Sequence, residues 1–282
     1  MRVAVLGCGS FGPHLVRNLA EAGVDDLVVF DPHEDRRERV AHAIPGVRAV
    51  PSVDAALHAD AVVVTTPPDT HAALATLALE AGCHVLVEKP MTVNPHTARA
   101  LVDLAFARER VLAVDHTALY EPAFTALQRG LAELGHVRGI HTVRRGRGSA
   151  VDELWDLAPH DLAVLDALWG PWSDVTCTRV AEVRRAEITL TWDDGRIATV
   201  TVEAGSPQTE RATELVGDRG RLGVNALTHR GPVEPLRAVV DDFLRAIRTG
   251  VPTRSGGRLG ARVVDAIAEA VRTSRARAGT PD

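Results

Sequence analysis

Short apolar runs alternate with amphipathic segments along the first 118 or so residues of the chain. The runs are rich in β-branched side chains and show little polar alternation, which is typical of strands buried on both faces of a sheet. The expected strands are Val3–Leu6, Leu27–Phe30, Ala61–Thr65, His84–Val87 and Val111–Val114, with helices at Phe11–Ala22, Thr70–Ala81 and Pro95–Arg108. Strands and helices in alternation predict βαβ units, and therefore an N-terminal domain (residues 1–118) with a doubly wound parallel sheet.

After Glu121 the pattern changes to segments with a period of two, joined by short turns. Asp193-Asp194-Gly195 is a turn signal of the kind that links neighbouring strands, and strands linked in this way pair antiparallel. The expected strands are Val137–Arg145, Val175–Val180, Ala186–Trp192, Arg196–Glu203 and Thr209–Val216, with helices at Pro122–Leu134, Trp155–Trp169, Leu236–Thr249 and Leu259–Arg277. This pattern predicts a C-terminal α+β domain (residues 119–282) with a mostly antiparallel sheet.

The composition is that of an ordinary globular protein: 45% of the 282 residues are hydrophobic, 24% are charged, and the net charge is −5. It excludes intrinsic disorder and a disulfide scaffold, and it argues against a nucleic-acid surface. The three cysteines lie far apart without a CxxC pair, so we expect reduced thiols, no metal site and a cytoplasmic location. No run is apolar for long enough to span a membrane, and the N-terminus does not match a signal peptide.

A glycine-rich turn, Gly7-Cys8-Gly9-Ser10-Phe11-Gly12, follows the first expected strand and opens the first expected helix. This GxGxxG spacing supplies a tight turn, close backbone approach to a pyrophosphate, and N–H groups at a helix N-terminus. Asp31 ends the second strand about 20 residues later, where a carboxylate takes the ribose hydroxyls; alternatively it only begins an Asp-Pro turn. Because a carboxylate there would repel a 2′-phosphate, the sequence favours NAD over NADP. The candidate cofactor-binding residues of this region are Gly7, Gly9, Ser10, Phe11, Gly12 and Asp31.

All but one of the 32 basic residues are arginine, and the exception is Lys89. It lies in Glu88-Lys89-Pro90, just past a buried strand, at the sheet edge where ligands bind in such folds. An ammonium group there can hydrogen-bond a substrate oxygen as a compact donor that arginine does not match. The alternative is that Lys89 is an ordinary surface lysine. The absence of any other lysine from the chain argues against this alternative.

Asp156 and His160 stand four residues apart, and on one helix they lie on the same face a turn apart. A dehydrogenase that acts on an alcohol needs a base for the hydroxyl proton, and histidine suits that task near neutral pH. The alternative is that Asp156 caps the helix and His160 is an ordinary helix residue.

The motifs together resemble the Gfo/Idh/MocA oxidoreductases, named after glucose–fructose oxidoreductase and inositol dehydrogenase. The matching stretches are VAVLGCGSFG, FDPHEDR, TTPPDTHAALATLALEAGCHVLVEKPMT, WDLAPHDLAVLDALWG, TWDDGRIATVTVE and PLRAVVDDFLRAIRTGVP, which together cover nearly the whole chain. The resemblance implies a Rossmann domain and an NAD(P)-dependent dehydrogenase that moves hydride between the nicotinamide and a hydroxyl of a sugar, polyol or nucleotide-linked sugar.

The same resemblance implies roles for individual residues. Lys89 and His160 would be catalytic, with Asp156 binding substrate hydroxyls beside them, and Pro90 would follow a cis peptide that aims the lysine. Thr66, Pro67 and His71 would line the cofactor cleft, together with Glu88, Lys89 and Pro90. The stretch Asp115–Phe124 looks most like relatives that oxidise the 3-hydroxyl of a nucleotide-linked sugar. It would place Tyr120 near the nicotinamide or the sugar, although a buried aromatic anchor is an equal alternative. Candidates for a substrate phosphate or carboxylate are His116, Arg144, Arg145 and Arg147, unless these arginines form a surface strand.

Two alternatives to a dehydrogenase stay open at this point. One is a glycoside hydrolase of the same fold that retains its NAD, and the other is a non-catalytic dinucleotide-binding protein. The chain also departs from the family in its short stretch Asp218–Pro235, which leaves substrate identity open. Ile188, Leu190 and Trp192 alternate as core or interface residues do, and members of the family often assemble through this sheet. We therefore expect a homodimer or homotetramer, a carbohydrate-like substrate, and no nucleic-acid or membrane partner.

Overall fold

The computed structural model describes residues 1–149, 151–228, 231 and 234–278, with side chains described as far as Ser274. The chain divides into two compact units: the first comprises Met1–His116 and Val233–Ala261, and the second comprises Thr117–Pro232 and Arg262–Asp282. This division differs from the contiguous domains expected from the sequence, because the penultimate helix belongs to the first unit.

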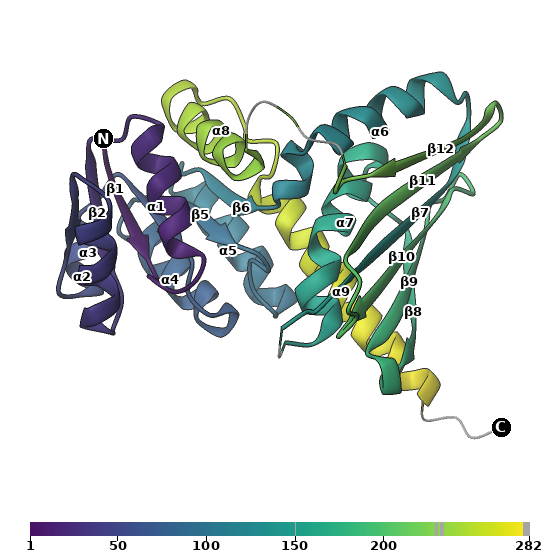
Figure 1. The fold of residues 1–282 in the computed structure, drawn as a ribbon, viewed down its shortest axis with the longest axis horizontal. Coiled ribbons are helices and arrows are strands. Elements are labelled where there is room, and N and C mark those ends of the chain that lie inside the picture. The colour runs from purple at the N-terminus through teal and green to yellow at the C-terminus, as the bar shows by residue number, and fades with distance from the viewer. Residues whose placement is uncertain (150, 229–230, 232–233, 279–282) are drawn as a thin grey trace. The chain divides into compact units, whose positions relative to one another are not determined.

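A six-stranded sheet forms the centre of the first unit, in the order β3-β2-β1-β4-β5-β6 (Figure 1). Every pair in it is parallel. Its strands are β1 (Arg2–Leu6), β2 (Asp26–Phe30), β3 (Val47–Ala49), β4 (Ala61–Val64), β5 (His84–Glu88) and β6 (Leu112–Asp115). The inner strands are buried on both faces, which explains their continuous runs of β-branched residues. The order reverses between β1 and β4, the point at which dinucleotide-binding folds open a crevice at the carboxyl edge.

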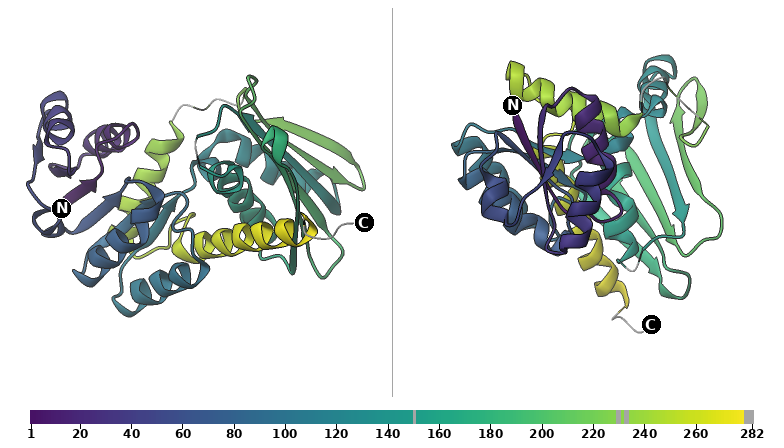
Figure 2. Two further views of the ribbon diagram at one scale, coloured as in Figure 1. Left: turned by 90° about the horizontal axis from the view of Figure 1, so that it is seen from below. Right: turned by 60° about the vertical axis from the view of Figure 1, so that its left-hand side comes forward.

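Helices cover both faces of this sheet (Figure 2). They are α1 (Gly12–Glu21), α2 (Glu34–Ala43), α3 (Val53–Leu57), α4 (Pro68–Glu80), α5 (Pro95–Ala107) and α8 (Pro235–Thr249). α1 packs on α8, and α4 packs on α5. The loop after α8 joins β6, because the N–H of Val114 donates to the carbonyl of Ser255 at 2.9 Å. The loop that contains Ser255 therefore lies at the same edge of the sheet as Lys89.

The second unit contains another six-stranded sheet, in the order β12-β11-β7-β10-β9-β8. Its strands are β7 (Val137–Gly146), β8 (Asp174–Val180), β9 (Arg185–Thr191), β10 (Ile197–Ala204), β11 (Glu210–Gly217) and β12 (Gly220–Asn225). All pairs are antiparallel except β7 with β10, so the expectation of a mostly antiparallel sheet is confirmed. The helical segments are η1 (Thr117–Tyr120), α6 (Pro122–Glu133), α7 (Glu153–Trp169), η2 (Ala181–Val183) and α9 (Gly257–Ala278), of which α9 begins in the first unit.

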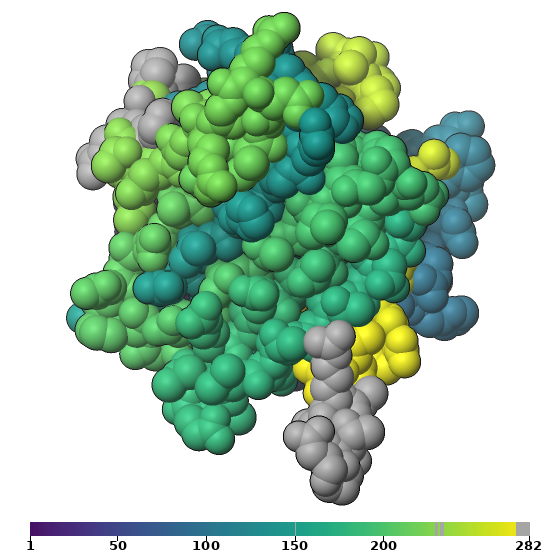
Figure 3. Space-filling model, turned by 90° about the vertical axis from the view of Figure 1, so that its right-hand side faces the viewer, coloured from purple at the N-terminus to yellow at the C-terminus, as the bar shows by residue number. Residues whose placement is uncertain are grey.

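The two faces of this second sheet differ. α6 and α7 cover one face, where Ile188, Leu190 and Trp192 are buried in the core. The described residues place no helix over the opposite face, which Figure 3 shows as a broad surface of strands. Its central rows carry threonine and other polar side chains, among them Thr176, Thr189, Thr199, His141 and Glu214. This outer sheet face is therefore more polar than the core face.

Several elements were not expected from the sequence: β3, α3 and β12. β12 forms a hairpin with β11 inside the short stretch Asp218–Pro235, of which residues 229, 230, 232 and 233 lie outside the described part. Within the described part of the chain, no helix is both long enough and apolar enough to cross a membrane.

Candidate active site

The turn between β1 and α1 leaves room where a phosphate would lie. A Cβ on Gly7 would come 2.5 Å from the carbonyl oxygen of Thr65, and a Cβ on Gly12 would come 2.1 Å from that of Gly7. A Cβ on Gly9, by contrast, would meet nothing within 4 Å. The first and third glycines are thus required by the packing of the protein itself. The middle one faces open space, as expected if a ligand approaches the backbone there.

The N-terminus of α1 is suited to an anionic ligand. Phe11 occupies the N-cap position and makes no side-chain capping hydrogen bond, so the first N–H groups of the helix are not capped by that residue. Phe11 is 42% exposed beside this turn. Burial, reinforced by the charge of Asp31, raises the pKa of the Cys8 thiol to about 12. The cysteine inside the motif therefore stays protonated and takes no part as a nucleophile.

Asp31 is held firmly at the end of β2. Its Oδ2 accepts a hydrogen bond from the N–H of Cys8 at 2.8 Å, and its Oδ1 accepts one from the N–H of His33 at 2.9 Å. The residue is only 4% exposed. The two backbone donors fix the carboxylate next to the glycine-rich turn, and each oxygen retains a lone pair for a ribose hydroxyl. The residues present therefore fit an NAD cofactor.

His71 links the loop after β4 to the residue that follows Lys89. Its Nε2 lies 2.7 Å from the carbonyl oxygen of Thr66, and its Nδ1 lies 2.8 Å from that of Pro90. Burial lowers the pKa of His71 below its ordinary value, and the charge of Lys89 acts in the same direction. Pro67 precedes the N-terminus of α4. The ring thus lies beneath the two loops, joining them, rather than on their surface.

Lys89 follows β5 at the carboxyl edge of the sheet, and its peptide bond to Pro90 is cis, as the family resemblance implies. Its backbone N–H donates to Oε2 of Glu88 at 3.0 Å. His116 lies nearby, 1% exposed, with Nδ1 at 2.9 Å from the hydroxyl of Ser255. Burial, together with the charge of Lys89, lowers the pKa of His116 to about 3. His116 is therefore a neutral, buried group of the fold rather than an exposed ligand for a phosphate.

In the second unit, Asp156 and His160 both lie on α7, one turn apart. The helix begins at Glu153 and its N-cap is Asp152, so Asp156 is not the capping residue. Oδ2 of Asp156 accepts a hydrogen bond from the N–H of Ser149 at 2.8 Å, which ties the preceding loop to the helix. η1, which ends at Tyr120, packs against the same helix. The structure thus gathers three of the predicted residues around α7.

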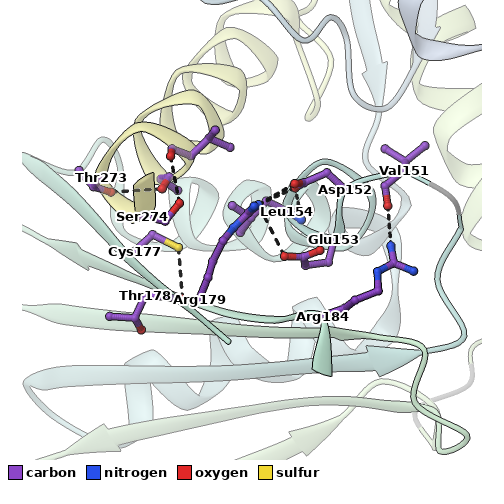
Figure 4. Close-up of polar contacts among 12 residues, drawn as sticks. Val151, Asp152, Glu153, Leu154, Cys177, Thr178, Arg179, Arg184, Thr273 and Ser274 are labelled. Carbon is purple, nitrogen blue, oxygen red and sulfur yellow. Dashed lines mark hydrogen bonds and ion pairs between the residues drawn. The ribbon is translucent and has the colours of Figure 1, made fainter. Parts of the chain in front are cut away.

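Arginines fix the start of α7 in place (Figure 4). Arg179 of β8 lies 2.7 and 2.8 Å from the two carboxylate oxygens of Asp152, and 3.6 Å from Glu153. Arg184 donates to the carbonyl of Val151 at 2.8 Å. Two further pairs secure the helix along its length, Arg144 with Asp161 and Arg262 with Asp166. The segment that carries Asp156 and His160 is therefore rigidly attached to the sheet.

These contacts reassign two of the arginines considered for a substrate phosphate. Arg144 is buried in a bidentate pair with Asp161, at 2.6 and 3.1 Å, so it serves α7 rather than a ligand. Arg145 follows it on the strand and therefore points to the opposite face of the sheet. There it lies 3.5 Å from both Glu203 and Glu210. The structure does not bring Arg145 together with His160.

Comparison with known proteins now identifies the group to which these features belong. Residues 1–116 match the model of the Gfo/Idh/MocA oxidoreductase family, described as having an NAD-binding Rossmann fold. The chain is 32% identical to the UDP-N-acetylglucosamine 3-dehydrogenase of Acidithiobacillus ferrooxidans, over 94% of this chain and 95% of that one. A solved structure of a dehydrogenase of that name and organism superposes with a TM-score of 0.90 at 30% identity, covering 99% of both chains. The myo-inositol dehydrogenase Hyg17 of Streptomyces leeuwenhoekii is 27% identical, over 89% of this chain and 86% of that one.

The chain belongs to the Gfo/Idh/MocA oxidoreductase family. It is accordingly an NAD-dependent oxidoreductase that transfers hydride between the nicotinamide and a hydroxyl group of a sugar-like or polyol-like substrate. The resemblance and the enzyme class predicted from the sequence are confirmed, and neither of the two alternatives gains support.

Two groups at the site of this family member escaped the sequence analysis. Ser255 contacts His116 from 139 residues further along the chain, a distance that no local pattern reveals. Asp115 stands beside Glu88, because the two residues occupy the same register on β6 and β5. That neighbour could have been found by aligning the carboxyl ends of the two expected strands, since parallel strands end at one edge of a sheet.

Proposed function

We propose that this enzyme oxidises the 3-hydroxyl group of a nucleotide-linked amino sugar. The observation that carries the proposal is the end-to-end similarity to UDP-N-acetylglucosamine 3-dehydrogenase, in sequence and in fold. The stretch Asp115–Phe124 supports the same assignment at the level of sequence. A nucleotide sugar is also consistent with the hydroxyl chemistry available from lysine, histidine and aspartate side chains.

The reaction removes one C–H and one O–H bond and forms a carbonyl group. The turn at Gly9, Asp31 and the loop of Thr66 and Pro67 would hold NAD, whose nicotinamide would supply the hydride acceptor. His160 takes the proton of the substrate hydroxyl, because a neutral imidazole is a suitable base near pH 7. Lys89 donates a hydrogen bond to the same oxygen and stabilises its negative charge as the proton leaves.

The remaining predicted residues have supporting roles in this proposal. Asp156 binds a neighbouring hydroxyl through its carboxylate and orients the sugar, with Tyr120 beside it. Glu88, His71 and Pro90 hold the lysine and cofactor loops in place. His116 and Arg145 are not assigned to the substrate, since one is buried against Ser255 and the other points to the outer sheet face.

Variants of the two proton-handling residues test the roles within this proposal. Lys89→Ala and His160→Ala should each lower kcat by about 10²-fold or more, because each removes a group that acts in the transition state. The Kd for NAD should remain within about threefold of the wild-type value in both variants. Lys89→Arg keeps the charge without the compact donor and should also lose most of the activity. Unchanged turnover in Lys89→Ala or in His160→Ala would remove that residue from the mechanism.

We also propose that the enzyme works as a homodimer or homotetramer in the cytoplasm. The outer face of the second sheet supports an assembly, because the described helices leave it uncovered. The three cysteines support a reducing compartment, since they form no disulfide bond and their side chains are buried.

A further inference from the structure

Two carboxyl groups end neighbouring strands at the sheet edge that carries Lys89. Glu88 is the last residue of β5 and Asp115 is the last residue of β6. The parallel register pairs their Cα positions directly. Residues in register on adjacent strands point to the same face of a sheet, so the two carboxyl groups lie side by side.

Both groups are withdrawn from water. Asp115 is 2% exposed with both carboxyl oxygens buried, and Oε1 of Glu88 is buried as well. Oε2 of Glu88 accepts the backbone N–H of Lys89. Neighbouring carboxylates that are shielded from water repel each other. Two carboxylates have no hydrogen to donate, so a hydrogen bond between them requires one proton.

The charges around Glu88 and Asp115 also favour one proton on the pair of carboxyl groups. Burial, the charge of Asp115 and the hydrogen bond to it raise the pKa of Glu88 well above its ordinary value, while Lys89 acts against them. His116, next to Asp115, and His71, on α4, face the same lysine; burial lowers the pKa of both histidines, and the charge of Lys89 acts in the same direction. With one proton the pair carries a single negative charge that matches the ammonium group. Without a proton the buried cluster would hold an uncompensated negative charge.

We propose that Glu88 and Asp115 share one proton and act as a single monoanionic counter-ion that positions the ammonium group of Lys89. The inference rests on the proposed function in one respect, namely that Lys89 contacts the reacting oxygen. Glu88 and Asp115 are positioning residues, because they act through the lysine and not on the substrate. A rigid counter-ion keeps the lysine at the sheet edge and leaves its hydrogens directed to a bound oxygen.

The shared proton can be observed without any turnover. Infrared spectra of the full chain are recorded at neutral pH without cofactor, and the spectrum of each variant is subtracted from that of the wild type. The wild type should show the carbonyl band of a protonated carboxylic acid. The band should vanish in Glu88→Gln and also in Asp115→Asn, because each remaining carboxyl group then ionises beside Lys89. Glu80→Gln, at an exposed position on α4, is the matched control and should leave the band unchanged. A band that is absent from the wild type, or that survives either substitution in the pair, would overturn the proposal.

Activity gives a second, independent readout. An amide beside one carboxylate reproduces both the hydrogen bond and the single charge of the pair. We therefore expect each single variant to lower kcat only about three- to tenfold, because one charge remains to position Lys89. The double variant Glu88→Gln/Asp115→Asn removes the charge and should lower kcat by about 30-fold or more, with the Kd for NAD little changed. A single variant as damaging as the double one would contradict a shared proton. The infrared result stands even if the nucleotide sugar proves not to be the substrate, so the two proposals fail separately.

Discussion

A buried imidazole next to an ammonium group stays neutral, and His116 shows how the fold enforces this. The ring is fully enclosed, and its Nδ1 lies 2.9 Å from the hydroxyl of Ser255. Burial and the charge of Lys89 lower its pKa from the ordinary value of 6.5 to about 3. His116 therefore carries no charge over the range in which histidine usually titrates, and the base that we propose is His160.

His116 should make the folded state sensitive to acid. The unfolded chain takes up a proton at this histidine near pH 6.5 and the folded chain does not, so stability is full above pH 6.5 and declines towards the folded pKa of about 3. His116→Asn keeps a partner for Ser255 but does not titrate. Between pH 7.5 and pH 5, the wild type should lose about 2 kcal/mol more free energy of unfolding than this variant. Urea denaturation at the two pH values measures the difference, and an equal loss in both proteins would show that His116 does not titrate on unfolding.

The sequence could indicate some of these residues and not others, for physical reasons. Lys89 could be predicted from the sequence because its motif follows a strand and because every other basic residue of the Lys/Arg type is arginine. Asp115 was missed because a carboxylate at a strand end is common and its significance arises only from Glu88 beside it. Arg144 was misjudged because the partner that neutralises it, Asp161, comes from a different element.

At the scale of elements, different glycines of the β1–α1 turn serve packing and binding. Gly12 is required by the backbone of Gly7, whereas Gly9 faces open space. Gly12→Ala should therefore lower the free energy of unfolding by about 1–3 kcal/mol. Gly9→Ala should leave the free energy of unfolding nearly unchanged. It should raise the Kd for NAD by about tenfold or more, because the added methyl group occupies the space through which the pyrophosphate approaches the backbone. Thermal unfolding and NAD titration of both variants check this contrast, and wild-type NAD affinity in Gly9→Ala would show that the cofactor does not approach there.

The elements that the sequence predicted are those with strong burial. β1, β4 and β5 are continuous apolar runs, and each was expected within a residue or two of its bounds. α3 was missed because it has only five residues, of which Ala56 is the one that is buried. β12 was missed for the same reason, since only Val224 is buried in it. The parallel pairing of β7 with β10 depends on the path of the chain between them, which no local pattern encodes.

At the scale of the whole molecule, we propose that the outer sheet face is the surface for self-association. Thr189 lies on this face, on β9, between Thr176 and Thr199 on the adjacent strands. Thr189→Arg would place a charged side chain in that surface, and burying an unpaired charge in an interface is costly. Analytical ultracentrifugation should show a dimer or tetramer for the wild type and a monomer for the variant, with the far-ultraviolet circular dichroism unchanged. An oligomer of wild-type size in the variant would place the interface elsewhere.

The central claim, oxidation of the 3-hydroxyl group of a nucleotide-linked amino sugar by NAD, has one direct test. UDP-N-acetylglucosamine carrying deuterium at carbon 3 is incubated with the enzyme and NAD, and the reduced cofactor is analysed by mass spectrometry. Transfer of the deuterium to the nicotinamide, with a 3-keto sugar nucleotide as the other product, is the result we predict. Reduced cofactor without deuterium would move the reaction to another carbon. No reduced cofactor from this substrate, while myo-inositol yields it, would contradict the claim and assign the enzyme to polyols.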